Sequence, residues 1–415
     1  MKNNMTKIIT TALAVMLMAL SWGIRTAAYA ETGSELSASM FSERDLTGAY
    51  EGEPVTISLN GASAQADSDL VQISGSNVTV TGAGTYILSG TLDNGSIIVD
   101  AAMEDKVQLV LNGVTVQSDS FAAIYVKQAD KVFVTLANGT VNTLSSFGFA
   151  QIDESKVDGV IYSKDDLTLN GGGALQITSP AGHGIVGKDE VTITGGTYAI
   201  QAAKHAIAAK DSLAVADGSF TLRAGEDGLH AENKDDETLG NLLIAGGSFD
   251  IQANDDAVHA NTVLQIDDGS LTLTAGEGLE GTWIQINGGS ISIVAADDGV
   301  NAARKSSAYT PTFTMNGGEL IVTMSQGDTD AIDSNGNLVI NGGTINVTGN
   351  SAFDYDGSAT CTGGTIIING QQVDSIPNQM MGGRGGMMNG GMMNGGMMNG
   401  GMMNGGKGTM GGRRW

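Results

Sequence analysis

One short motif recurs along about half of the chain, residues 158–369, and it constrains the fold more than any other feature. Each copy contains an apolar strand, a turn such as Gly195-Gly196-Thr197, a second strand, and a corner of small residues that ends in one apolar residue. The second turn position is glycine in every copy, at Gly173, Gly196, Gly218, Gly247, Gly269, Gly289, Gly318, Gly343 and Gly364. The steps of 20 to 29 residues between these glycines are typical of a solenoid.

Apolar residues alternate with polar residues inside each copy, which is the signal of strands with one buried face. One column of the second strand reads Tyr198, Phe220, Phe249, Leu271, Ile291, Leu320, Ile345 and Ile366. We therefore predict an all-β fold, a right-handed parallel β-helix (solenoid) with three short strands per coil. Like residues then stack at about 4.8 Å, and the right hand follows from the bias of parallel crossovers. In this arrangement Tyr198, Phe220 and Phe249 form part of the core rather than a binding site.

Composition narrows the class of protein further. The chain has 415 residues, with 61 Gly, 4 Pro and a formal net charge of -25. Abundant glycine with little proline fits tight corners between strands. Nucleic-acid binding requires a basic surface, so the acidic balance argues against a nucleic-acid partner.

The two ends of the chain differ from the repeats. Residues 1–30 read as a signal peptide, with Lys2 and Lys7 before an apolar run at 8–20 and a small-x-small site at 28–30. A retained anchor is the alternative, although the run is short for a membrane span. We expect a secreted or cell-surface protein.

The remaining boundaries follow from changes in composition. Residues 31–55 form a lead-in or cap, residues 56–377 the β-helix, and residues 378–415 a disordered tail rich in Met, Gly and Asn. Strand signals before residue 146 are less regular, so they form either the first coils or a separate small β-domain. The ending Arg413-Arg414-Trp415 is compatible with contact to the cell envelope.

Cys361 is the only cysteine, so an internal disulfide is excluded. It aligns with Ile340 in an inward column, and we predict a small core hydrophobe.

Acidic residues gather at the corner beside the third strand. The candidate metal ligands are Asp227, Asp255, Asp256, Glu277, Glu280, Asp297, Asp298, Asn301, Asp330, Asp333 and Asp354. Carboxylates held about 5 Å apart by stacked strands raise each other's pKa and cost stability. Either this edge is well solvated, or it binds a cation. Six to eight oxygen ligands suit Ca²⁺, but the spacing matches neither a Ca²⁺-binding nonapeptide nor an EF-hand loop.

Basic residues form two further columns, and only the histidine column is predicted to face this edge. His230 and His259 share one column, which indicates either a polar ladder or a transition-metal site of two histidines and a carboxylate. Lysine precedes aspartate in three consecutive copies, at residues 164, 188 and 210. These pairs form a salt-bridged surface, or Lys188 and Lys210 bind a uronate. A lysine could also act as the base of a β-eliminating lyase.

Trp283 is predicted to be exposed, because it aligns with polar outward residues. Tyr309 lies in a predicted loop, residues 303–312, and could lie beside it. An exposed Trp on a sheet is either a platform for stacking sugars or an ordinary surface aromatic. The sequence shows no Ser/His/Asp triad, phosphate loop or CxxC metal motif.

Several segments resemble the clostridial-type secreted carbohydrate-binding domain family. They are AIYVK at 123–127, SKDDLTL at 163–169, GHGIVGKD at 182–189 and GGT at 195–197, and the resemblance covers about residues 41–370. It implies a right-handed parallel β-helix similar to polysaccharide lyases, Ca²⁺ binding, and attachment to cellulose or polygalacturonate without established catalysis. The family's acidic corner corresponds to Asp227, Asp256 and Asp298. The chain departs from the family at Glu277 and Glu280.

We therefore expect a secreted, non-catalytic, calcium-binding protein that binds plant-wall polysaccharide. A Ca²⁺-dependent pectate-type lyase and a structural cell-surface spacer are the alternatives.

Overall fold

The computed structural model describes residues 36, 40–50, 52–150, 156–325 and 330–378. The chain divides into two units, Met1–Met380 and Met381–Trp415, and every described residue belongs to the first. The predicted signal peptide and almost all of the predicted tail lie outside the described residues. Within the described ranges, no helix is long and apolar enough to cross a membrane.

The described residues form 36 β-strands and no α-helix. The first group comprises β1 (Val55–Gly61), β2 (Ala64–Ala66), β3 (Val71–Ser74), β4 (Asn77–Val80), β5 (Gly84–Leu92), β6 (Ser96–Asp100), β7 (Lys106–Ser118), β8 (Ile124–Gln128), β9 (Lys131–Leu136), β10 (Val141–Ser146), β11 (Gly159–Ser163) and β12 (Asp166–Gly171). The second comprises β13 (Ala174–Ser179), β14 (His183–Gly187), β15 (Glu190–Ile193), β16 (Thr197–Ala202), β17 (Ile207–Ala209), β18 (Ser212–Val215), β19 (Ser219–Ala224), β20 (Leu229–Ala231), β21 (Asn241–Ile244), β22 (Ser248–Ala253), β23 (Asp256–Ile266) and β24 (Ser270–Ala275). The third comprises β25 (Glu277–Ile286), β26 (Ser290–Ala295), β27 (Val300–Ala302), β28 (Thr312–Met315), β29 (Glu319–Met324), β30 (Asp330–Ser334), β31 (Asn337–Ile340), β32 (Thr344–Thr348), β33 (Ser351–Tyr355), β34 (Ala359–Cys361), β35 (Thr365–Ile368) and β36 (Gln371–Val373).

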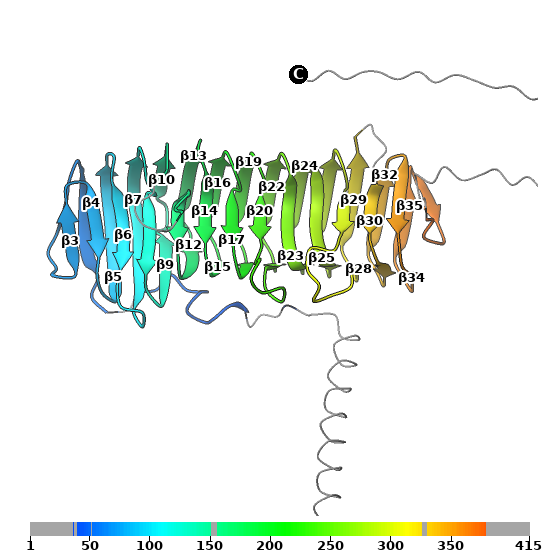
Figure 1. Cartoon of the computed structure of the whole chain (residues 1–415), viewed down its shortest axis with the longest axis horizontal. Coiled ribbons are helices and arrows are strands. Elements are labelled where there is room, and N and C mark those ends of the chain that lie inside the picture. Colours follow the sequence, from blue (N-terminus) through cyan, green and yellow to red (C-terminus); the bar gives the residue numbers. More distant parts are fainter. Residues whose placement is uncertain (1–35, 37–39, 51, 151–155, 326–329, 379–415) are drawn as a thin grey trace, which may run out of the picture. The chain divides into compact units, whose positions relative to one another are not determined.

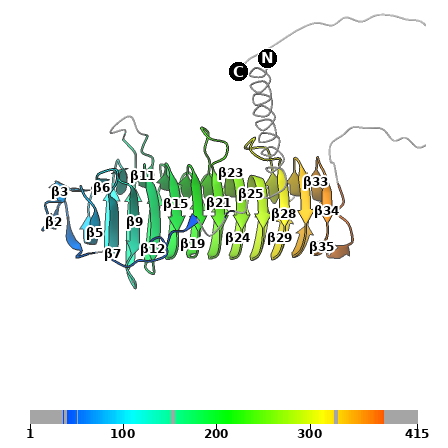
Figure 2. The same ribbon diagram turned by 90° about the horizontal axis from the view of Figure 1, so that it is seen from below.

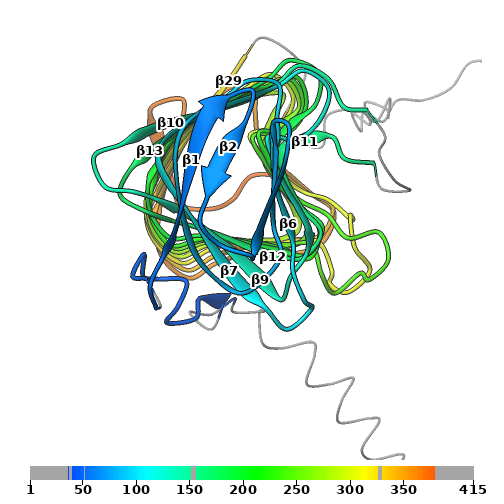
Figure 3. The ribbon, with the colours of Figure 1, turned by 90° about the vertical axis from the view of Figure 1, so that its left-hand side faces the viewer.

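All of these strands join one sheet, which is parallel except for the pairs β1–β2, β3–β4 and β35–β36. Most strands pair with the strand three places later, as in β11–β14–β17–β20. In β23 and β25 two such strands run together, so β23 pairs with both β20 and β21. Figures 1 and 2 show the strands stacked side by side, and Figure 3 shows the coils superposed in an end-on view. The all-β prediction is confirmed, and the parallel stack is solenoid-like.

The predicted register is also confirmed. Tyr198 pairs with Phe220, and Phe220 with Phe249. Their rings stack with centroids 5.0 and 4.6 Å apart and lie within 8° of parallel. All three side chains are buried, so they belong to the core as expected. The recurring turn glycines have positive φ from Gly196 onwards, which explains why glycine returns at that position.

The small-residue corner brings the backbones of neighbouring coils close together. A Cβ atom on Gly228 would lie 2.4 Å from Ile251 Cγ2 and 2.6 Å from the Ala257 carbonyl oxygen. Only glycine or alanine occurs at this position in the eight coils from Gly184 to Ala352. The close approach fixes the side chains on either side of the corner in columns, and these columns build the candidate site.

The described part of the lead-in, residues 40–50 with Leu36, packs along the side of the strands. Asp45 is buried, its Oδ1 accepting a hydrogen bond from Thr168 Oγ1 at 2.6 Å and lying 2.9 Å from Lys131 Nζ. Burial alone would raise the pKa of Asp45, but its hydrogen bonds with Thr168, Ser42 and Lys131 hold that pKa below its usual value. Farther along the sheet, the Leu36 backbone N–H donates to Gln265 Oε1 at 2.8 Å.

The prediction for Cys361 is wrong. Cys361 does pair with Ile340, but its side chain is exposed. It lies in β34, which has no pairing beyond β31 in the described residues. A core position therefore becomes exposed where no further strand covers it.

Candidate functional site

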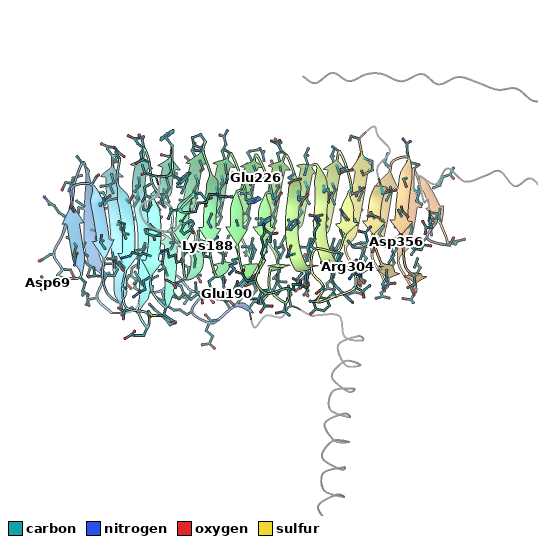
Figure 4. The ribbon with its side chains drawn as sticks, in the orientation of Figure 1. Asp69, Lys188, Glu190, Glu226, Arg304 and Asp356 are labelled. Carbon is teal, nitrogen blue, oxygen red and sulfur yellow. The ribbon has the colours of Figure 1, made fainter. Side chains whose placement is uncertain are left out.

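One outward column beside the small-residue corner changes its chemistry along the sheet. In register order it contains Tyr125, Tyr162, Val186, Ala208, His230, His259, Glu280, Asn301, Asp333 and Asp354. A neighbouring column, three positions earlier in each copy, contains His183, His205, Asp227, Asp256, Glu277, Asp298, Asp330 and Ser351. The edge thus has an aromatic and apolar section, an imidazole section and an acidic section. In Figure 4, Lys188 lies among the middle coils and Asp356 toward the C-terminal coils.

An open groove of about 810 Å³ lies over the first two sections. Its basic lining residues are Lys156, Lys164, Lys188, Lys210, Lys234, His183, His205 and His230. Val186 and Ala208 also line the groove, together with the acidic residues Asp158, Glu232 and Asp235. The groove is therefore a local basic region on a chain whose formal net charge is -25.

The structure places Lys188 and Lys210, two predicted binding residues, in this groove. Lys210 forms an ion pair with Asp235 at 2.7 Å rather than with the neighbouring Asp211. That hydrogen bond raises the pKa of Lys210 above its usual value. Lys188 is exposed and forms no ion pair within the described part of the chain. The predicted salt-bridged pairing therefore does not account for either lysine.

The four histidines of the chain form one stacked column in the imidazole section. Successive ring centroids from His183 through His205 and His230 to His259 are 4.9, 4.1 and 4.8 Å apart. Sequence reasoning placed His230 and His259 on this edge but did not join His183 and His205 to them, because the two pairs occupy different columns. The signal was present, since the histidines are spaced 22, 25 and 29 residues apart, as the repeats are.

Three of the predicted metal ligands already have partners in this section. Asp227 Oδ2 lies 2.6 Å from His230 Nδ1. Burial alone would raise the pKa of Asp227, but His205 and His230 hold that pKa well below its usual range. His259 Nδ1 lies 2.9 Å from Asp256 Oδ2 and 2.7 Å from Glu280 Oε2. Burial alone would lower the pKa of His259, but these two carboxylates raise it to about 10.

Asp256 and Glu280 compete for the same imidazole. Glu280 also forms an ion pair with Lys305. Although burial opposes ionisation, His259 and Lys305 lower the pKa of Glu280, whereas burial and the charge of Glu280 raise the pKa of Asp256. Internal cations thus neutralise this part of the predicted acidic corner.

The acidic section has no such compensation. Asp298, Asp333 and Asp354 form no ion pair with a basic side chain in the ranges that the structure describes. Burial and neighbouring carboxylates raise the pKa of Glu277 to about 8, of Asp333 to about 7 and of Asp298 to about 6. These carboxylates lie close enough to disfavour simultaneous ionisation.

Unused oxygen atoms also face this section. Asn301 donates from Nδ2 to Glu277 Oε2 at 3.0 Å, while Asn301 Oδ1 and Asp354 Oδ1 are buried and have no hydrogen-bond partner among the described residues. Asp330 belongs to the same section, and its backbone N–H donates to Asp298 Oδ1 at 3.1 Å. Two further predicted ligands, Asp255 and Asp297, are exposed and outside this buried set.

Trp283 and Tyr309 contact each other as expected, with ring centroids 5.9 Å apart in an edge-to-face arrangement at 68°. The expectation that Trp283 is exposed is wrong, because the residue is half-buried. Its Nε1 is buried without a hydrogen-bond partner in the described residues. Since the rings are not coplanar and Tyr309 lies across the indole, the pair does not form a flat platform. Neither residue lines the basic groove.

Comparison with known proteins gives three similarities. A solved structure described as the polysaccharide lyase-like protein from C. thermocellum, a gadolinium derivative, is 23% identical and covers 77% of this chain and 96% of that chain, with a TM-score of 0.35. A carbohydrate-binding domain-containing protein of Acetivibrio thermocellus is 36% identical over 137 residues, which are 32% of this chain and 48% of the relative. The alignment thus spans about half the length of that relative. A family model described as carbohydrate-binding domain-containing protein matches residues 74–331 and 277–375. Because these matches extend over more than half of the sequence, the chain belongs to this carbohydrate-binding domain family.

Proposed function

We propose that this protein is a secreted, non-catalytic, calcium-binding protein that binds a plant-wall-type polysaccharide, cellulose or polygalacturonate, in the basic groove. The observation that carries the proposal is the gathering of five lysines in one groove of a strongly acidic chain. Lysines outnumber the acidic residues Asp158, Glu232 and Asp235 in the lining, and an excess of one sign of charge in a cleft concentrates ligands of the opposite sign. Of the two glycans, the groove therefore favours the anionic polygalacturonate.

The repeat gives the groove a geometry that suits a linear polymer. Lys164, Lys188 and Lys210 each follow a residue of one parallel register, Ser163, Gly187 and Ala209. Neighbouring lysines therefore start from backbones about 4.8 Å apart. A uronate chain lying along the sheet would meet ammonium groups on successive coils, while Val186 and Ala208 offer small apolar contacts to the sugar rings.

The same arrangement supports a coil geometry that we infer for the site. We infer that the coils wind with a right hand and contain three strands each, because parallel crossovers are right-handed and most strands pair three places along. Under this geometry the lysines lie on one continuous strip.

Calcium is proposed for the acidic section, where the donor atoms fit it. Glu277, Asp298, Asp333 and Asp354 supply carboxylate oxygens, and Asn301 Oδ1 and Asp354 Oδ1 are buried without hydrogen-bond partners among the described residues. Hard oxygen donors of this kind suit Ca²⁺. A bound Ca²⁺ would supply the positive charge that these repelling carboxylates lack. Asp227, Asp256 and Glu280 are less suited, because imidazoles already contact them.

A calcium-dependent lyase is the second candidate, favoured by the lysines and histidines that share the groove. A general base works best when its pKa lies near the working pH. The raised pKa of Lys210 keeps that amine protonated, which supports charge pairing rather than proton abstraction. Incubation with polygalacturonate and Ca²⁺ tests this directly, since β-elimination gives an unsaturated product that absorbs ultraviolet light.

The test of the binding proposal is co-sedimentation of the mature chain with insoluble cellulose and with calcium-gelled polygalacturonate. Lys188→Ala should weaken polygalacturonate binding roughly tenfold, because a hydrogen bond to a charged group contributes about 1.5 kcal/mol. Lys106→Ala is the matched control, since Lys106 is exposed, pairs with Asp130 and lies outside the groove lining.

Equal loss in both variants would reject the groove as the site. Binding to cellulose alone would show that the ligand is the neutral glycan and that another surface binds it. Binding to neither polysaccharide would favour the alternative of a structural cell-surface spacer.

A further inference from the structure

Asp227 lies between two imidazoles in the stacked column. Asp227 Oδ2 lies 3.2 Å from His205 Nδ1 and 2.6 Å from His230 Nδ1. The other oxygen, Oδ1, accepts a hydrogen bond from the Asp256 backbone N–H at 3.0 Å. That bond fixes the carboxylate, so Oδ2 is held toward both ring nitrogens. Asp227 itself is only 3% exposed.

His205 Nδ1 contacts Asp227 twice. It accepts a hydrogen bond from the Asp227 backbone N–H at 3.1 Å and lies 3.2 Å from Asp227 Oδ2. An imidazole nitrogen that accepts carries no proton, so in this tautomer no proton lies between the ring and the carboxylate. Because the nitrogen has one lone pair, a cation bound there would replace the backbone N–H as its partner, and Oδ2 would bind the same cation.

We propose that His205 Nδ1, His230 Nδ1 and Asp227 Oδ2 bind one divalent transition-metal ion of the zinc class. The three residues offer ligand atoms that all lie within 4.8 Å of one another. Two imidazoles and a carboxylate with one open position is a ligand set that Zn²⁺ adopts. Neighbouring ligands of a tetrahedral ion with bonds of about 2.0 Å are about 3.3 Å apart, so the two observed separations need small changes.

The outer nitrogens of both rings face carboxylates, as in many metal-binding histidines. His205 Nε2 lies 3.3 Å from Glu226 Oε2, and His230 Nε2 lies 3.7 Å from Glu232 Oε2. A hydrogen bond there would leave Nδ1 as the nitrogen that faces the ion. Glu226 and Glu232 would thus orient the two rings, while Asp227 would bind the ion itself.

An independent observation comes from the two ends of the column. His183 Nδ1 and His259 Nε2 are buried and have no hydrogen-bond partner among the described residues, and His259 is only 8% exposed. Burying a polar nitrogen without a partner is unfavourable.

This site is separate from the proposed calcium site and does not depend on glycan binding. Imidazole nitrogen selects zinc, copper or nickel, whereas calcium and magnesium prefer oxygen alone. Because His205 and His230 both line the basic groove, the open position of the ion would lie beside the groove. A sugar oxygen or water could complete the coordination there.

The test is isothermal titration of the mature chain with Zn²⁺, carried out in excess Ca²⁺ and without glycan. We expect one tight site, and a loss of roughly 10- to 100-fold or more in affinity for His205→Gln and for His230→Gln, since even outer residues change affinity by that factor. His183→Gln is the matched control, because it removes a histidine from the same column but not from the three ligands. It should keep the wild-type affinity within about threefold, well short of the effect of losing a ligand.

Two results would overturn the assignment: Zn²⁺ binding no tighter than Mg²⁺ binding, or an equal loss in His183→Gln and His205→Gln. Asp227→Asn offers a further check, because it keeps the shape of the side chain but weakens it as a ligand. Circular dichroism of each variant establishes that the sheet is intact, so a loss of affinity reports on the site. A loss of zinc binding with glycan binding retained would leave the groove proposal intact.

Discussion

Asp333→Asn tests whether the acidic section is a site of repulsion that calcium relieves. Asp333 is half-buried and stacks between Asn301 and Asp354 in register. Among the described residues its side chain accepts one hydrogen bond, from Asn335 at 3.3 Å. Burial, with the charges of Asp298 and Asp354, raises its pKa to about 7. Asparagine keeps the size of the side chain and removes the charge.

The size of the effect follows from the shift in pKa. A rise from about 3.9 to the folded value spans about three units, which correspond to about 4 kcal/mol at 1.36 kcal/mol per unit. Because Asp333 retains contact with solvent, screening reduces this figure, and we expect about 2 kcal/mol. The penalty is absent below about pH 4, where the carboxyl is protonated in both states. It grows as pH rises between the two pKa values, because the folded state there holds a proton that the unfolded state has released. It is complete above the folded pKa, where the carboxyl has lost its proton in both states.

The assay is thermal unfolding followed by circular dichroism, at pH 4 and pH 8, with chelator and with Ca²⁺. With chelator at pH 8, Asp333→Asn should melt above wild type, and at pH 4 the two should coincide. With Ca²⁺ the order should reverse, because calcium at 100 times its Kd contributes about 2.7 kcal/mol to the folded state and the variant lacks a ligand. The exposed Asp297→Asn is the matched control and should change little in either condition.

An Asp333→Asn variant that is less stable than wild type in chelator would refute the repulsion. A variant whose order relative to wild type is the same with and without Ca²⁺ would refute the calcium ligand. Mg²⁺ in place of Ca²⁺ distinguishes a specific site from general screening of charge.

Three further outcomes are expected. Phe220→Ala should lower the free energy of unfolding by about 3–5 kcal/mol in denaturant titrations, because it opens a cavity in the aromatic stack; a loss below 1 kcal/mol would contradict the stack. Asp45→Asn should leave Lys131 without its ionic partner and speed proteolytic cleavage within residues 40–50, whereas unchanged cleavage would show that the lead-in is held elsewhere. Gly228→Ala should lower the melting temperature, since the new Cβ would lie 2.4 Å from a neighbouring side chain; an unchanged melting temperature would show that the corner has room.

The fold could be predicted in detail because each coil repeats the alternation of the one before. Pairing Tyr198 with Phe220 and Phe249 required only the repeat step, since parallel coils leave no freedom of register once one face is buried. The exposed Cys361 marks the limit of this reasoning. The repeat pattern predicts that a residue points inward, but it does not predict whether another coil follows to cover that residue.

The candidate site was predictable only in part, because side chains from different columns meet across a corner. The acidic residues were recognised from their spacing, yet the sequence did not show that His259 bridges Asp256 and Glu280, or that Lys305 reaches Glu280. These contacts depend on side-chain direction and on a loop that leaves the repeat. The contact of Tyr309 with Trp283 was expected, but its edge-to-face geometry was not, since loop conformation carries no period.

The solenoid stacks like residues, and it thereby also stacks like charges. Along the imidazole section basic side chains offset the repulsion between carboxylates, because His230 and His259 lie directly beside Asp227 and Asp256. Beyond Lys305 the same edge continues with carboxylates and no basic partner for Asp333 in the described residues. A backbone fixed by sheet pairing cannot move these acids apart. The change from histidine to acid along one column therefore divides the edge into a part with basic side chains beside its acids and a part for which we propose an external cation.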